Sequence, residues 1–141
     1  MVTPYIVFHG QCADALSFYS KIFETKVRMQ QTYGDYIPEG SAVEPGTLSN
    51  WILHAEMEIA GTAFWFADEG KRVERGNMVK LTVHVPNKGA AQRIFDGLSD
   101  GGEIILPPTE TFYSTFHAST VDPFGVPWEI VAEEAPGKAG L

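Results

Sequence analysis

The order of secondary-structure elements that the sequence predicts occurs twice along the chain. Residues 3–8 are β-branched and aromatic, which is typical of a strand, and the apolar residues of 13–23 recur with the spacing of a helix that covers a sheet. Residues 78–85 and 88–99 show the same two patterns about 75 positions later. Because both halves begin with a strand and continue with a helix, we expect a duplicated module.

Further strands are expected after the helix in each half. In the first half they are 26–33, 52–59 and 62–67, and in the second half 103–106, 115–121 and 127–131. Asn87 is expected to cap the second helix, and glycines and prolines throughout 34–50 predict a long loop. The pattern therefore predicts an α+β fold, a single domain over 1–141 made of two tandem βαβββ modules at 1–68 and 77–133.

Each predicted module has a single helix for its sheet, so one face of the sheet is left without a helix. Antiparallel and mixed sheets bury one face on a helix and leave the other free to meet water or another surface. We expect the open faces of the two modules to meet and form a cleft. The residues that line this cleft are then the candidates for a functional site.

The composition favours a packed globular protein and excludes several kinds of partner. The chain has 141 residues, of which 44% are hydrophobic and 20% charged, and its net charge is −8 without a basic stripe. Nucleic acid and anionic membranes would be repelled, and no apolar run approaches the roughly 20 residues that cross a bilayer. The lone cysteine, Cys12, and an N-terminus unlike a signal peptide predict a cytoplasmic protein.

Two motifs carry a resemblance to a known superfamily. Phe18, Tyr19 and Phe23 on the first helix, and Asp122-Pro-Phe-Gly125 before the last strand, resemble the glyoxalase/bleomycin resistance/dioxygenase (vicinal oxygen chelate) superfamily. Within it, the segments 5–8, 54–56, 110–113 and 122–128 are similar to the PhnB-like, 3-demethylubiquinone-9 3-methyltransferase-like branch. The resemblance spans nearly the whole chain and implies the same two-module fold. Relatives are commonly homodimers, so we expect a homodimer here.

The branch name suggests methyl transfer, which the sequence does not support. Transfer from S-adenosylmethionine would use a glycine-rich turn between a strand and a helix. Gly10-Gln-Cys12 is no such turn. We therefore do not predict a methyltransferase, and whether the protein is an enzyme is left open.

Metal-dependent relatives hold a divalent ion with four ligands, mostly His and Glu, on the first and last strands of each module. Aligning the motifs places Pro4, Phe64, Met78 and Glu129 at these positions, with an error of one residue on each strand. Only Glu129 can bind a hard cation, and a lone carboxylate does not offset the dehydration of a divalent ion. We expect no metal cofactor at the inherited site.

A relocated divalent metal site is the alternative. His54 and Glu56 alternate with apolar residues on one strand, on the face that we assign to the cleft. Together with Glu129 they would rebuild a site in which the ion acts as a Lewis acid, as in an isomerase, lyase or dioxygenase. Alternatively, His54 and Glu56 lie on a strand face that is exposed to water and binds no ion.

Aromatic residues and a lysine complete the predicted cleft. Phe64 and Phe66 are expected to face it with Glu129, while Trp65 and Trp128 face the helices. Lys80 beside Glu129 is either a structural ion pair or an anchor for an acidic or carbonyl substrate.

Tyr113 lies in a segment able to cover the mouth of the predicted cleft. For His9, His84 and His117, at strand ends or near a loop, we expect hydrogen bonding and no direct role. Cys12, near the start of the first helix, has no base beside it in the sequence and is expected to be inert. The predicted binding residues are His54, Glu56, Phe64, Phe66, Lys80, Tyr113 and Glu129.

Three functions fit this pattern. A cleft with aromatic walls and few polar groups is typical of a protein that binds a small aromatic or amphipathic molecule without transforming it, and this is the function we expect. The alternatives are the metal-dependent enzyme described above and a module whose main role is assembly. The sequence does not identify the ligand.

Overall fold

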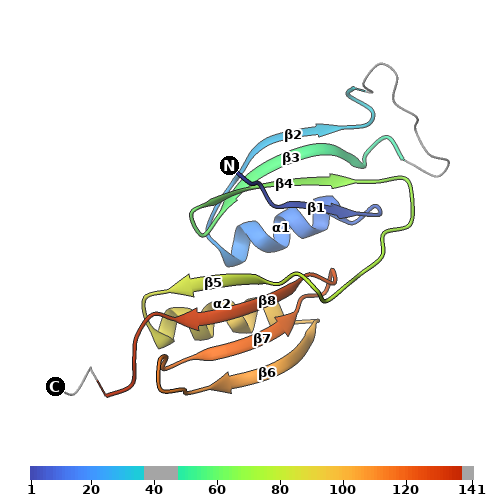
Figure 1. Cartoon of the computed structure of the whole chain (residues 1–141). Coiled ribbons are helices and arrows are strands. Elements are labelled where there is room, and N and C mark those ends of the chain that lie inside the picture. The colour runs from blue at the N-terminus through green and yellow to red at the C-terminus, as the bar shows by residue number, and fades with distance from the viewer. Residues whose placement is uncertain (37–47, 138–141) are drawn as a thin grey trace. The chain divides into compact units, whose positions relative to one another are not determined.

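The computed structural model describes residues 1–36 and 48–137, and most of the predicted loop at 34–50 lies outside them. The chain divides into two compact units, Met1–Glu74 and Arg75–Leu141 (Figure 1). The first unit contains β1 (Tyr5–Phe8), α1 (Cys12–Ile22), β2 (Val27–Thr32), β3 (Ile52–Ile59) and β4 (Thr62–Asp68). The second contains β5 (Leu81–Val85), α2 (Lys88–Ser99), β6 (Glu103–Thr109), β7 (His117–Val121) and β8 (Pro127–Ala132).

The two units have the same sheet topology. The strand order is β1-β4-β3-β2 in the first sheet and β5-β8-β7-β6 in the second. In each sheet the first strand pairs in parallel with the last, and the other neighbours are antiparallel. This is the βαβββ arrangement twice, so the predicted α+β fold of two tandem modules is confirmed.

One helix packs against one face of each sheet and buries most of the apolar residues there. α1 contacts β3 and β4, and α2 contacts all four strands of its sheet. Tyr19 of α1 packs on Phe66 with ring centroids 6.0 Å apart, and Phe95 of α2 packs on Phe116 at 5.9 Å. Within the described part of the chain, neither helix has the length and apolar character needed to cross a membrane.

The two helices are capped in different ways. Asn87 accepts a hydrogen bond from the Ala90 amide at 2.9 Å, so the predicted cap of α2 is confirmed. Gln11 makes no such bond at the start of α1. There the buried carboxylate of Asp68 accepts hydrogen bonds from the amides of Gly10, at 2.8 Å, and Cys12, at 3.0 Å. The cap of α1 therefore comes from the end of β4, far away in sequence.

The Asp122-Pro-Phe-Gly125 motif forms the turn between β7 and β8. The Asp122 side chain is 2% exposed and accepts hydrogen bonds from two turn amides, at 2.9 and 3.0 Å, and from the indole N–H of Trp128 at 2.9 Å. Gly125 has φ +94°, a conformation that disfavours residues with a side chain. The aspartate thus has a structural role, and the turn places Trp128 in the core and its neighbour Glu129 on the other face of the sheet.

Candidate functional site

Corresponding hydrogen bonds align the two sheets position by position. At the end of β4 the Glu69 amide donates to Phe8 at 2.7 Å, and at the end of β8 the Glu133 amide donates to Val85 at 2.7 Å. Counting back from these bonds makes Trp65 of β4 the counterpart of Glu129 of β8. The register also pairs Ala55 of β3 with Phe66, and Ala118 of β7 with Ile130, so His54 and His117 correspond as well.

β4 presents Trp65 on the open face of its sheet. Phe64 and Phe66 are 5% and 0% exposed, and Phe66 packs on Tyr19 of α1, whereas Trp65 is 40% exposed and pairs directly with Glu56. The predicted orientation of Phe64, Trp65 and Phe66 is therefore wrong. Consecutive aromatic residues show no alternation, and a shift of one residue exchanges the faces of a strand.

The open face of the first unit carries the His54 cluster, which consists of Tyr5, His54, Glu56 and Trp65. The His54 ring lies 4.9 Å from the Trp65 ring and 5.7 Å from the Tyr5 ring, both edge to face. Its Nε2 contacts a Glu56 carboxylate oxygen at 3.1 Å, and its Nδ1 lies 3.4 Å from the Tyr5 hydroxyl. Partial burial raises the pKa of Tyr5. Both nitrogens of His54 are thus engaged within the unit.

The open face of the second unit carries the Glu129 network, which consists of Lys80, Tyr113, His117 and Glu129. One oxygen of Glu129 lies 3.8 Å from the Lys80 ammonium and 3.7 Å from His117 Nε2. The Tyr113 hydroxyl is hydrogen-bonded to Nδ1 of the same imidazole. His117 Nε2 is shielded from solvent and has no partner within hydrogen-bond distance. The predicted ion pair between Lys80 and Glu129 is present.

The role of His117 is the residue assignment that we missed. We expected this histidine to lie near a loop without a site, but it begins β7 and contacts Glu129. The signal was available in the sequence, because apolar Ala118 must face the helix and so turns His117 toward the other face. Tyr113 was expected near the mouth of the cleft, and the fold of its loop places its hydroxyl against His117.

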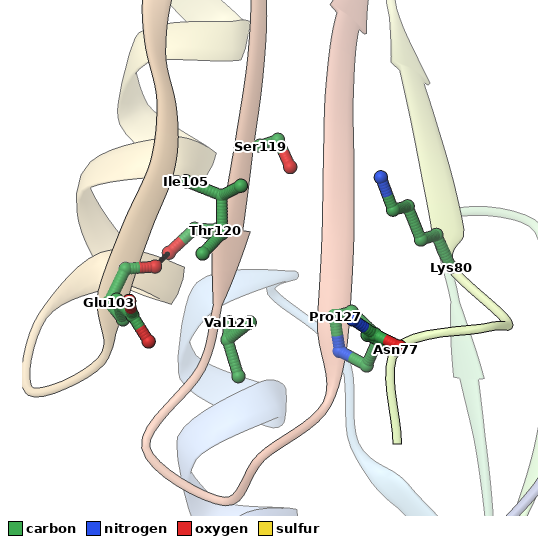
Figure 2. A pocket seen from close by; sticks show the side chains of 8 residues that line it. All are labelled: Asn77, Lys80, Glu103, Ile105, Ser119, Thr120, Val121 and Pro127. Carbon is green, nitrogen blue, oxygen red and sulfur yellow. Dashed lines mark hydrogen bonds between the residues drawn. The ribbon is translucent and has the colours of Figure 1, made fainter.

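A pocket of about 410 Å³ lies beside the Glu129 network in the second unit (Figure 2). Lys80 lines it on one side of β8, and Ser119, which pairs with Glu129, lines it on the other together with Ile105 (Figure 2). The full lining is Asn77, Lys80, Glu103, Ile105, Ser119, Thr120, Val121 and Pro127. Of the predicted binding residues, Lys80 lines the pocket, and Glu129 lies 3.8 Å from the Lys80 ammonium without lining the pocket itself.

The predicted site residues are distributed over both units. His54 and Glu56 lie together on the first sheet, whereas Lys80, Tyr113 and Glu129 lie together on the second. Each open face is a feature of one unit, and the cleft that we expect from their meeting stays a prediction.

The residues at the inherited metal positions do not fit a divalent ion. The strand register pairs Tyr5 with Trp65 and Thr82 with Glu129, so Glu129 supplies the one carboxylate. Tyr5 and Trp65 lie one residue from the predicted Pro4 and Phe64, within the expected error, whereas Thr82 lies four residues from the predicted Met78. Within residues 1–36 and 48–137, no three His, Cys, Asp or Glu side chains gather in a way that would hold a metal ion. A relocated ion at His54, Glu56 and Glu129 stays a hypothesis.

Two βαβββ modules, each with an open sheet face, define a protein of the glyoxalase/bleomycin resistance (vicinal oxygen chelate) fold. Residues 1–131 match the family model described as 3-demethylubiquinone-9 3-methyltransferase. The chain belongs to this family.

Three proteins are similar to this chain in sequence or in fold. Protein YjdN of Escherichia coli is 29% identical over 149 residues, covering 96% of this chain and 97% of its own. The crystal structure of PA1353 from Pseudomonas aeruginosa has a TM-score of 0.80 at 26% identity, with 94% and 97% of the two chains covered. The fosfomycin resistance protein FosX of Listeria monocytogenes, at 10% identity and TM-score 0.65 over 95% and 93% of the chains, is similar in fold alone.

Proposed function

We propose that the protein binds a small amphipathic molecule in the pocket on the open face of the second unit. The observation that carries the proposal is the pocket beside the Glu129 network, with a volume of about 410 Å³. Small-molecule sites commonly have volumes of about 300–1,000 Å³ and apolar walls with a few oriented polar groups. A molecule of the size of a substituted aromatic ring would fit this space.

The lining separates into an apolar and a polar part, which favours an amphipathic ligand. Ile105, Val121 and Pro127 offer apolar contact to the body of a ligand. Lys80 and Ser119 offer a charge and a hydroxyl to its polar end. Burial of an apolar body supplies affinity in such sites, and the polar groups determine its orientation.

The family description names methyl transfer to demethylubiquinone, so quinone-like compounds belong among the ligands to be tested. The transfer step itself has little support in this chain. The amides of Gly10 and Cys12, at the turn that would have to approach a cofactor, donate to the Asp68 carboxylate. This turn therefore has a structural partner within its own unit.

The test is a thermal-shift screen of aromatic, quinone-like and amphipathic compounds, followed by calorimetric titration. A ligand present at about 100 times its Kd stabilises the folded protein by about 2.7 kcal/mol. Ile105→Trp, which fills the pocket, should abolish the shift. Ile104→Trp is the matched control, because Ile104 is similarly exposed, 52% against 54%, and does not line the pocket. Stabilisers that act equally on Ile105→Trp and the wild type would contradict the proposal.

Self-association is a second function that a specific observation favours. β6 is an edge strand, and its residues Ile104, Ile105 and Leu106 are 52%, 54% and 38% exposed. Adjacent exposed apolar residues on an edge strand promote pairing with another chain. The predicted homodimer would use this edge, and light scattering after gel filtration should then show that Ile104→Asp shifts the wild-type dimer toward monomer. An unchanged mass would exclude this edge.

A further inference from the structure

The pocket of the second unit has a second charged residue, Glu103, on the side opposite Lys80. Glu103 begins β6 and Lys80 directly precedes β5, and these are the two edge strands of the sheet (Figure 2). β8 and β7 lie between them. Neighbouring strands are about 4.8 Å apart, so the backbones of the two residues are separated by roughly 14 Å. The pocket therefore has an ammonium on one side and a carboxylate on the other.

The register of β6 places the Glu103 side chain on the open face of the sheet. Glu103 pairs with Val121, and residues directly opposite each other on neighbouring strands share a face. Val121 follows Ser119 by two residues on β7, so both line the pocket from that face. The Thr120 hydroxyl donates to the Glu103 carbonyl at 2.8 Å, which holds the start of β6 against β7. The position of Glu103 at the pocket thus follows from strand pairing.

The two charges of the pocket differ in their partners. The Lys80 ammonium lies 3.8 Å from Glu129, so its positive charge is balanced within the sheet. Of the basic side chains that the structure describes, none forms an ion pair with Glu103. The whole chain has a net charge of −8, which attracts cations and repels anions. The carboxylate without a counter-ion therefore determines which charge the pocket favours.

We infer that the pocket takes an amphipathic amine, whose ammonium group pairs with Glu103. The inference rests on the proposed binding function and specifies its ligand class. The apolar body of the ligand lies on Ile105 and Val121, and a neutral oxygen at its other end accepts a hydrogen bond from Lys80. A carboxylate at that end would meet the like charge of Glu129. Binding forms a charge-assisted hydrogen bond, and no covalent bond forms or breaks.

The experiment is isothermal titration calorimetry at about pH 8, where histidine is ordinarily uncharged. One set of probes is tyramine, tyrosol and 4-hydroxyphenylacetate, and the other is 5-methoxytryptamine, 5-methoxytryptophol and 5-methoxyindole-3-acetate. Within each set an ammonium is replaced by a hydroxyl or a carboxylate. We expect at least one amine to bind more tightly than its alcohol and its carboxylate. Added salt should weaken the amine and leave the alcohol unchanged, because salt screens exposed charges.

Variants at Glu103 test the assignment of the carboxylate. Glu103→Gln should weaken amine binding by about threefold to fivefold, the range of an exposed ion pair, and leave alcohol binding unchanged. Glu103→Lys should reverse the preference, so that the carboxylate binds more tightly than the amine. Glu110→Gln is the matched control, because Glu110 is exposed in the same unit and does not line the pocket. It makes the same change in net charge and should leave binding of the amine unchanged.

The outcomes distinguish the inference from the proposed function. An amine preference that Glu103→Gln removes, Glu110→Gln keeps and Ile105→Trp abolishes together with binding supports both. Alcohols or carboxylates that bind as tightly as the amines, or an amine preference that Glu103→Gln keeps, overturn the inference and leave the pocket as a binding site. Absence of any binding that depends on Ile105 among the six compounds also overturns the inference. The proposed function fails with it if the broader screen finds no ligand that depends on Ile105.

Discussion

The open faces of the two sheets differ in the contacts that residues at corresponding positions make. His54 and His117 occupy equivalent positions, and each lies between a tyrosine hydroxyl and a glutamate. In the first unit the glutamate comes from the same strand, Glu56, and in the second from the neighbouring strand, Glu129.

The last strand of each module accounts for this difference. Where the second module has Glu129, the first has Trp65, whose ring packs against His54 at 4.9 Å. Trp65 therefore belongs to a cluster of side chains that pack on one another within the first unit. The carboxylate instead brings Lys80 to the edge of a pocket. A different residue at an equivalent position therefore goes with an aromatic cluster in the first unit and with a carboxylate beside a pocket in the second.

Phe64→Ala and Trp65→Ala test this comparison with the largest expected effect. Phe64 is 5% exposed on the helix side, so its truncation should lower the free energy of unfolding by about 3–5 kcal/mol. Trp65 is 40% exposed on the open face, so its loss should cost about 1 kcal/mol. Urea unfolding measures both values. A reversed order would show that β4 has the opposite orientation and that Trp65 does not correspond to Glu129.

Asp68→Ala and Asn87→Ala compare the two helix caps. Asp68 satisfies the amides of Gly10, Cys12 and Ile52, which would be left buried without partners, so we expect a loss of about 3 kcal/mol. Asn87 satisfies one amide at an exposed helix start, and its loss should cost about 1 kcal/mol. Equal losses in chemical denaturation would argue against a long-range cap in the first unit.

Tyr113→Phe and Tyr5→Phe probe the two histidine clusters with a smaller effect, below about 1 kcal/mol for each half-exposed hydroxyl. The Tyr113 hydroxyl bonds directly to His117, whereas the Tyr5 hydroxyl lies 3.4 Å from His54. Nitrogen NMR of the imidazoles should therefore show a larger change at His117 than at His54. Equal changes would mean that the two clusters do not differ in this contact.

Labelling of the Cys12 thiol should show the smallest effect of these tests. Its side chain is fully buried, and burial, with a contribution from the charge of Asp68, raises the pKa of its thiol far above the usual value. The start of a helix commonly lowers a thiol pKa, so this site differs from an exposed one. We expect no reaction with a disulfide reagent in the native protein at pH 8 and complete reaction after unfolding. Rapid native labelling would mean that α1 opens.

The sequence predicted those features that depend on short-range patterns. Asn87 was identified as a cap because its acceptor reaches an amide three residues away, and the burial of Ala55 and Met57 follows from strict alternation. The pairing of Lys80 with Glu129 was expected because both were assigned to one sheet face. The faces of Phe64 and Trp65 were missed because consecutive aromatic residues show no alternation, and His117 was missed although its neighbour Ala118 gave a local signal.

Local periodicity is enough to specify two βαβββ modules, because apolar spacing selects helix or strand from neighbouring residues alone. The turn motif that ends in Trp128 and Glu129 is likewise a local feature, since Asp122 bonds to amides within a few residues. Tertiary structure alone decided that Asp68 caps α1 and that Tyr113 and His117 join the Lys80 and Glu129 pair. These contacts join residues from separate strands and loops, and the register that brings them together is determined by packing of the whole sheet on its helix.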